Sequence, residues 1–84
     1  MDQAQAFDAA VVRSRTLPHQ PNDVLLELYG LYKQASEGDV AGDRPGGFDF
    51  KGAAKYDAWA RRRGMTRDEA MGAYVELVDR LAAG

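Results

Sequence analysis

The fold of this chain is decided by residues 28–39, which read LYGLYKQASEGD. On a helix of about 100° per residue, an apolar stripe and a strip of aromatic and polar residues lie side by side along this stretch and the turn before it. The apolar stripe consists of Val24, Leu28, Leu31 and Ala35, and the neighbouring strip consists of Tyr29, Tyr32, Lys33 and Ser36. The first set predicts a face that packs into a core, and the second predicts a binding face beside it.

The role of the second strip stays open on this pattern alone. A tyrosine offers a π-face and a hydroxyl, and a lysine supplies a point charge, so Tyr29, Tyr32 and Lys33 could stack a flat ring and pair with an anion. Tyrosines at helical spacing also commonly complete a hydrophobic core. The strip is therefore compatible with ligand binding and with core packing.

The composition is that of one compact globular domain, expected over residues 1–84, with 45% hydrophobic and 29% charged residues. The chain contains no cysteine, which excludes disulfides, thiolate metal sites and thiol nucleophiles. No apolar run approaches the roughly 20 residues of a membrane span, and the first residues lack the basic start of a secretory signal. We therefore expect a cytoplasmic monomer without stable membrane association.

The charge balance argues against a nucleic-acid partner, because the formal net charge is -2 and nucleic-acid-binding domains are usually basic. A local basic patch is nevertheless present in residues 51–63. Its basic residues are Lys51, Lys55, Arg61, Arg62 and Arg63, and its only acid is Asp57. Such a patch can hold an anionic ligand or dock an acidic partner.

Hydrophobic periodicity and helix-end signals predict four helices and no strand. The first is expected over about residues 3–15, the second from an Asn22 N-cap to Gly38, the third over about residues 50–63 after an Asp49 N-cap, and the fourth after the capping box Thr66-Arg67-Asp68-Glu69. Four helices around a single long connection predict an all-α four-helix bundle.

The long connection after Gly38 is expected to cross the bundle. Within it, residues 44–47 read RPGG and have the composition of a turn. Phe48 and Phe50 follow this turn, and we expect them to plug the crossing into the core.

Two positions in the helices leave alternatives open. Gly30, inside the second helix, costs up to ~1 kcal/mol relative to alanine, so either the loss is tolerated or something packs very close to the backbone there. On the third helix Lys51, Lys55 and Trp59 recur every four residues, an arrangement that suits a phosphate near a ring. Core packing is the alternative for Trp59.

The order of the motifs resembles the acyl-CoA-binding protein family. After residues 28–35, the matching segments are Gly38-Asp39, Arg44-Pro45-Gly46, Asp49-Phe50-Lys51-Gly52 and residues 54–59, which read AKYDAW. With Phe7 upstream and Ala73-Tyr74-Val75 downstream, the likeness runs from about residue 5 to residue 82. It implies an up-down-down-up bundle with the long connection between the second and third helices.

The resemblance also implies a function and a site. The function is the non-catalytic binding, buffering and intracellular transport of long-chain fatty acyl-CoA esters, with acyl-CoA-using enzymes as further partners. By the same resemblance, Tyr29, Lys33 and Lys55 hold the 3′-phosphate of the coenzyme, Tyr32 contributes to the adenine site, Tyr74 matches another ligand-contacting aromatic position, and Arg15 matches a basic position where the family more often has lysine. Lys51 joins this set as the neighbour of Lys55 on the third helix.

Two other function classes stand against this reading. A small thioesterase would need a nucleophile and a base, and the candidates Ser14, Thr16, Ser36, Thr66 and His19 form no recognisable constellation. No catalytic residue, metal site or cofactor is therefore expected. The serious alternative is a helical protein-interaction module that uses the basic face of the third helix.

Overall fold

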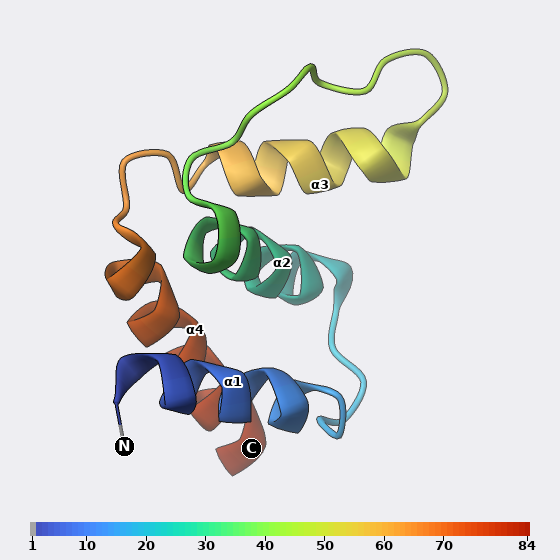
Figure 1. Cartoon of the computed structure of the whole chain (residues 1–84). Helices are drawn as coiled ribbons and strands as arrows, with labels where there is room; N and C mark the ends of the chain where they lie inside the picture. The colour runs from blue at the N-terminus through green and yellow to red at the C-terminus, as the bar shows by residue number, and fades with distance from the viewer. Residues whose placement is uncertain (1) are drawn as a thin grey trace.

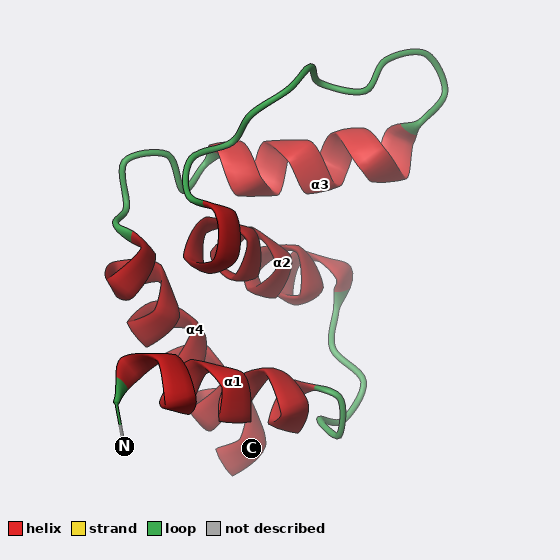
Figure 2. Ribbon diagram, viewed as in Figure 1, coloured by secondary structure: helices red, strands yellow, loops and turns green. Residues whose placement is uncertain are grey.

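A computed structural model describes residues 2–84 as four α-helices, with no strand among these residues (Figures 1 and 2). The helices are α1 (Gln3–Ser14), α2 (Asn22–Glu37), α3 (Phe50–Ala60) and α4 (Arg67–Ala83). In Figure 1, α2 and α3 both run from right to left, whereas α1 runs from left to right. α4 begins near the end of α3 and runs back to α1, where the C-terminus lies. The predicted all-α bundle is confirmed. Of the domain expected over residues 1–84, Met1 lies outside the described residues.

The helix ends follow most of the expected signals. The Thr66 hydroxyl accepts from the Glu69 N–H at 3.0 Å and the Glu69 carboxylate accepts from the Thr66 N–H at 2.8 Å, so the predicted capping box is formed. Asp49 caps α3 by accepting from the N–H of Gly52 at 2.9 Å, as predicted. A further capping box at the start of α1, formed by Asp2 and Gln5, was not predicted.

Three helix ends differ from their predicted positions by one to three residues. Asn22 is the first residue of α2 rather than its cap, because Pro21 already has the extended backbone of an N-cap, with φ -60° and ψ 157°. α1 ends at Ser14 and α3 at Ala60, since tighter i to i+3 hydrogen bonds replace the α-helical pattern beyond both residues. The arginine triplet at residues 61–63 therefore lies in a turn rather than in the last turn of α3.

The core lies where α2 and α1 pack against α4, and α3 packs against α2 alone. Its buried apolar residues are Phe7, Ala10, Leu28, Leu31, Ala35, Ala70, Tyr74, Leu77 and Val78. The stripe predicted on α2 is confirmed, although Val24 is only half-buried. A leucine moved from water to such a core contributes about 1.5–3 kcal/mol. α3 buries only Ala58, so most of its side chains are partly or fully exposed.

At Gly30 the backbones of α2 and α3 approach each other closely. A Cβ atom added at this position would lie 2.4 Å from the carbonyl oxygen of Ala58 and 2.9 Å from its carbonyl carbon. The absence of a side chain therefore lets the two helix backbones touch, which decides between the two explanations left open by the sequence. This contact fixes the register of α3 along α2.

The connection between α2 and α3, residues 38–49, runs along the outer side of α3 (Figure 1) and is held against it by three polar contacts. We call this connection the strap. The Trp59 indole N–H donates to the carbonyl of Gly38 at 2.8 Å, and the Tyr56 hydroxyl donates to the carbonyl of Gly42 at 3.0 Å. Arg44 forms a two-pronged ion pair with Asp57, with N···O distances of 2.8 and 2.9 Å. These hydrogen bonds hold the pKa of Asp57 below its usual range and raise the pKa of Arg44.

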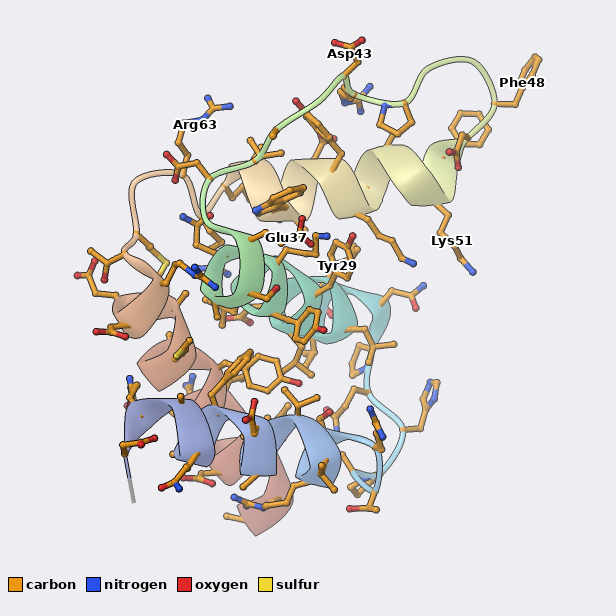
Figure 3. All side chains as sticks on the ribbon, in the orientation of Figure 1. Tyr29, Glu37, Asp43, Phe48, Lys51 and Arg63 are labelled. Carbon is orange, nitrogen blue, oxygen red and sulfur yellow. The ribbon has the colours of Figure 1, made fainter. Side chains whose placement is uncertain are left out.

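The prediction that Phe48 and Phe50 plug the core is wrong. Their exposed fractions are 92% and 74%, and Phe48 points away from the bundle at the tip of the connection (Figure 3). The two rings pack edge to face on each other, with their centroids 6.3 Å apart. The physical reason is that the polar contacts of the strap anchor the connection outside α3, where no core is within reach of either ring.

Buried polar contacts fix the C-terminal end of α2. The Gln34 amide, fully buried, donates to Asp39 Oδ1 and to the carbonyl of Met65, both at 2.8 Å. The N–H of Gly64 also donates to Asp39, and these two donors lower the pKa of Asp39, Gly64 most strongly. Arg67 donates to the carbonyls of Ala35 and Ser36 at 3.1 and 2.7 Å. This end of α2 is thereby anchored to the turn between α3 and α4.

Candidate ligand-binding site

An open groove of about 520 Å³ runs along the exposed edge between α2 and α3. It is lined by Asn22, Leu25, Leu26, Tyr29, Phe50, Lys51, Ala54 and Lys55. Its wall is mostly apolar, with two ammonium groups and a phenol at the edge, and its volume falls in the range of small-molecule sites. Leu25 and Phe50, which are both exposed, form its apolar wall.

Two cation–π contacts join α2 and α3 beside this groove. The Lys55 ammonium of α3 lies 5.3 Å from the ring centre of Tyr29 on α2, and the Lys33 ammonium of α2 lies 4.7 Å from the ring centre of Trp59 on α3. Residues 29 and 33, and likewise 55 and 59, are one helical turn apart, and the two helices run in the same direction. Each helix therefore supplies an aromatic ring to one contact and a cation to the other. We call these four residues the cation–aromatic ladder.

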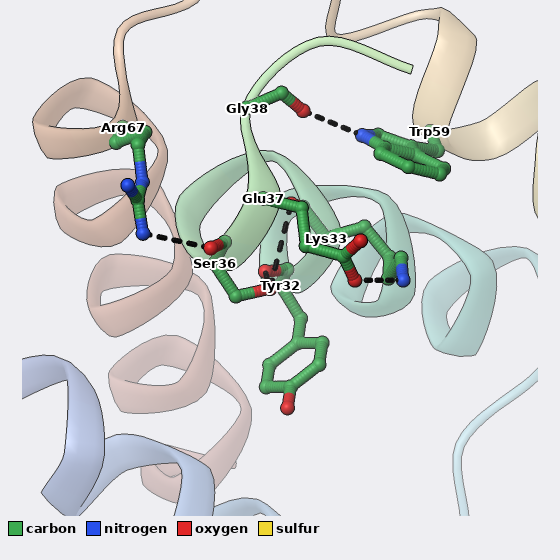
Figure 4. A network of polar contacts seen from close by, with 7 residues as sticks. All are labelled: Tyr32, Lys33, Ser36, Glu37, Gly38, Trp59 and Arg67. Carbon is green, nitrogen blue, oxygen red and sulfur yellow. Dashed lines mark hydrogen bonds and ion pairs between the residues drawn. The ribbon is translucent and has the colours of Figure 1, made fainter. Parts of the chain in front are cut away.

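The two cations of the ladder have different surroundings. The Lys33 ammonium also donates a hydrogen bond to the carboxylate of Glu37, one turn further along α2 (Figure 4). This hydrogen bond is the main reason why the pKa of Lys33 is raised, and burial opposes it. Within residues 2–84, Lys55 and Lys51 make no ion pair with an acid. Lys51, in the first turn of α3, lines the groove, and its side chain extends away from the helix (Figure 3).

Tyr32 and Tyr74 belong to a second aromatic group, on the α1 and α4 side of α2. The ring centres of Phe7 and Tyr74 are 5.2 Å apart, those of Phe7 and Tyr32 are 6.0 Å apart, and those of Tyr32 and Tyr74 are 6.4 Å apart. Tyr74 is only 4% exposed, whereas Tyr32 is 40% exposed. Tyr74 is thus a core residue that supports Tyr32, and Tyr32 offers a face to solvent.

Arg15 is separate from both aromatic groups. It is the exposed C-cap residue of α1, and its side chain makes no hydrogen bond or ion pair with the described residues. The structure thus places Tyr29, Lys33, Lys51 and Lys55 along one edge, Tyr32 and Tyr74 across α2 from them, and Arg15 at the end of α1.

Some residues at this edge were missed by sequence reasoning. The pairing of Glu37 with Lys33 was signalled by their i, i+4 spacing. Leu25 carried no signal as part of a groove, because its place in the wall depends on where α3 lies. Trp59 is half-buried and is not part of the hydrophobic core: its ring lies under Lys33, and its N–H donates to the carbonyl of Gly38 in the strap.

The hydroxyl groups considered as nucleophiles are all engaged with the backbone. Ser14 and Thr16 donate to the carbonyls of Val11 and Arg13, and Ser36 donates to that of Tyr32 (Figure 4). Thr66 accepts from a backbone N–H in its capping box. Across residues 2–84, the histidine and acidic side chains form no group of three that could hold a metal ion. None of the helices described here is long and apolar enough to cross a membrane.

Comparison with known proteins gives a consistent result. The family model described as acyl CoA binding protein matches residues 4–78. The chain is 48% identical over 79 residues to acyl-CoA-binding protein homolog 1 of Caenorhabditis elegans, covering 93% of this chain and 92% of the relative. It is 45% identical over 85 residues to a homolog from Manduca sexta, covering 99% and 94%. The crystal structure of acyl-CoA-binding protein 2 of Oryza sativa superposes with a TM-score of 0.93 at 40% identity, covering 95% of this chain and 90% of that one.

Proposed function

The chain belongs to the acyl-CoA-binding protein family, and from this premise we propose that it binds long-chain fatty acyl-CoA esters, buffers their concentration and transports them inside the cell. The observation that carries the proposal is the union of an apolar groove and the cation–aromatic ladder on one edge of the molecule. An acyl-CoA is a polyanion with a flat ring at one end and a long apolar chain at the other. This edge offers cations to the phosphates and an apolar wall to the acyl chain, and the exposed ring of Tyr32, on the other side of α2, is available to the flat ring.

The acyl chain occupies the groove between Leu25, Phe50 and Ala54. Burial of about a dozen methylenes at ~0.8 kcal/mol each gives on the order of 10 kcal/mol before the entropy of binding is subtracted. The chain therefore supplies most of the driving force, and affinity rises with its length until the groove is filled.

The coenzyme lies across α2, with its 3′-phosphate near Lys55, Lys33 and Tyr29. Charge-assisted hydrogen bonds to phosphate contribute about 1–3 kcal/mol each, so these contacts add specificity to the affinity of the chain. The exposed ring of Tyr32 serves the adenine, and buried Tyr74 holds Tyr32 in place.

Two outer cations complete the proposed site. Lys51 stands at the groove entrance and attracts the anionic ligand. Arg15, exposed at the end of α1, reaches a second phosphate. Neither is paired with an acid within residues 2–84, so each has a full charge to offer.

The bound ester is released unchanged. The hydroxyls of Ser14, Thr16, Ser36 and Thr66 are held by backbone groups rather than by a general base, which leaves them unactivated. Assay of free CoA with a thiol reagent tests this point. Release that is faster than the uncatalysed rate and proportional to protein concentration would contradict it.

The remaining parts of the proposal concern the domain, the oligomeric state, the location in the cell and the partners. We expect one domain over residues 1–84, acting as a cytoplasmic monomer that exchanges esters with acyl-CoA-using enzymes and needs no cofactor. The alternative of a protein-interaction module is not favoured by the comparisons. Arg62, in the basic triplet, is in addition directed to Glu27 of α2 at 3.8 Å.

Calorimetric titration with three ligands tests the proposed function. We expect a long-chain acyl-CoA to bind far more tightly than either CoA or the free fatty acid, because only the ester engages both the groove and the ladder. The affinity for CoA alone reports the contribution of the ladder, and the affinity for the fatty acid alone reports the contribution of the groove. Equal affinities for the fatty acid and the ester would overturn the proposal, since the ladder would then have no role.

A further inference from the structure

Glu37 stands at a position where the helix itself gains nothing from an acid. It is the last residue of α2, whose final turn contains no basic residue. The C-terminal end of a helix carries partial negative charge, so a carboxylate there is unfavourable. The order Lys33 then Glu37 is also the weaker orientation of an i, i+4 ion pair. A residue that breaks two local rules indicates a role outside helix stability.

The role is suggested by what Glu37 does to the ladder. Its carboxylate holds the Lys33 ammonium while that ammonium lies 4.7 Å from the ring centre of Trp59. The Lys33 side chain is only 19% exposed, and the Glu37 side chain is 53% exposed. Lys33 is therefore a covered cation whose remaining open side is occupied by an exposed and displaceable anion.

The other cation of the ladder provides the contrast. Lys55 lies over Tyr29 at 5.3 Å, and it makes no ion pair with an acid among residues 2–84. A phosphate that approaches Lys55 gains its full attraction. A phosphate that approaches Lys33 must displace the Glu37 carboxylate or share the ammonium with it, and in both cases the two anions repel each other.

We propose that Glu37 is an internal counter-ion of Lys33 that competes with the phosphate of the ligand and thereby sets how strongly the site favours phosphorylated coenzyme. The inference rests on the proposed function and deepens it. Glu37 reduces the gain in affinity that the phosphate brings, and it returns to Lys33 when the ligand leaves. It is a specificity-determining residue rather than a ligand contact.

The substitution Glu37→Gln tests the inference because it removes the charge and keeps the side-chain length. We expect acyl-CoA to bind about two- to fivefold more tightly, the range of a partly exposed ion pair. The affinity for acyl-dephospho-CoA, which lacks the 3′-phosphate, should not change. Tightening that is equal for the two ligands, or absent with both, would overturn the proposal.

A matched control separates this local effect from net charge. Glu76→Gln makes the same change on α4, at an exposed position two residues from Tyr74 and so on the opposite face of that helix. It should leave both affinities unchanged. If Glu76→Gln tightens acyl-CoA binding as much as Glu37→Gln does, the effect is one of overall charge and the proposal is wrong.

The Lys33→Ala background tests whether Glu37 acts through Lys33. In that background Glu37→Gln should no longer tighten binding, because the Lys33 ammonium for which Glu37 and the phosphate compete is absent. Persistence of the full effect would assign Glu37 a direct repulsion of the ligand and contradict the counter-ion role. These outcomes are distinct from failure of the proposed function, in which the unsubstituted protein would not bind acyl-CoA. The comparison of the variants can be made whenever acyl-CoA binding to the unsubstituted protein is measurable.

Discussion

Tyr29 and Tyr32 lie three residues apart on α2, yet they belong to regions of different character. Tyr29 faces α3 at an exposed edge, where a cation covers its ring. Tyr32 packs beside Phe7 and buried Tyr74. The edge between α2 and α3 is held by one close backbone contact and by polar groups, whereas the α1, α2 and α4 region is held by burial of apolar surface. We infer that α2 divides a mainly stabilising side, on which only the exposed ring of Tyr32 is offered to the ligand, from a binding side that carries the groove and the ladder.

The largest expected effect lies on the stabilising side. Tyr74→Ala should lower the free energy of unfolding by about 3–5 kcal/mol, because it removes a buried aromatic ring and leaves a cavity. Tyr29→Ala should cost far less stability and should mainly weaken acyl-CoA binding. Urea unfolding followed by circular dichroism measures both. If Tyr74→Ala does not fold, Tyr74→Leu retains part of the volume and gives a measurable, smaller loss.

The result that would break the comparison is an equal loss of stability for the two tyrosines. The edge between α2 and α3 would then be part of the core, and the ladder would be a stabilising feature. Tyr74→Phe serves as the control, since it keeps the ring and should change stability little.

Gly30→Ala should have the next largest effect, because it acts on the backbone contact that holds α3 against α2. The added methyl group would lie 2.4 Å from a backbone oxygen of Ala58, so α3 must move away from α2. We expect a net loss of about 1–3 kcal/mol in the free energy of unfolding, even though alanine favours helix by up to ~1 kcal/mol. Binding of acyl-CoA should weaken as well, because the shift moves the cation of each ladder contact away from the aromatic ring on the other helix.

Gly46→Ala is the control for this substitution, because nothing lies within 4 Å of a Cβ atom at that position. Its stability should stay within about 0.5 kcal/mol of the unsubstituted protein. A Gly30→Ala variant that is more stable than the original chain would show that helix propensity outweighs the contact, and that α3 is only loosely attached to α2.

Substitutions of the ladder cations should affect binding and leave stability almost unchanged. Lys55→Ala and Lys33→Ala should each weaken acyl-CoA binding by roughly 1–3 kcal/mol, with the larger loss at Lys55 because Lys33 already has Glu37 as a partner. Thermal unfolding should be nearly the same for both variants. The losses should largely disappear with acyl-dephospho-CoA, since the mutation and the missing phosphate remove the same interaction. A loss at Lys33 that is as large with the truncated ligand would refute the phosphate assignment.

Much of the fold could be predicted from the sequence because its signals are local. The apolar stripe of α2 and the caps at Asp49 and Thr66 depend on residues only a few positions apart. The relative directions of the helices are not local, and they came from the family resemblance rather than from periodicity. Helix ends were less well predicted, as at Pro21, because neighbouring residues compete for the same cap.

The sequence and the resemblance named the residues of the candidate site but not their pairings. That Lys33 lies over Trp59 depends on the register of two helices, which the Gly30 contact fixes. The exposure of Phe48 could not be read from its hydrophobicity, since it follows from where the strap is anchored. Part of that anchor is the pair Arg44 and Asp57, which are separated by 13 residues.

The smallest expected effect concerns this strap, and it depends on pH. Because hydrogen bonds from Arg44 lower the pKa of Asp57, the folded chain takes up a proton there less readily than the unfolded chain does. The pair therefore stabilises the strap at neutral pH, and this contribution is lost as the pH falls below the ordinary aspartate pKa of 3.8 and through the lower pKa of Asp57 in the folded chain. In an NMR titration, signals of Gly42 and Tyr56, the neighbouring strap contact, should change in that range.

The substitution Arg44→Gln should raise the titration midpoint of Asp57 toward the ordinary value of an aspartate. A midpoint that does not move would mean that the pair does not form in solution. Acyl-CoA affinity at neutral pH should change little in this variant, because the ladder and the Gly30 contact hold α3 independently of the strap.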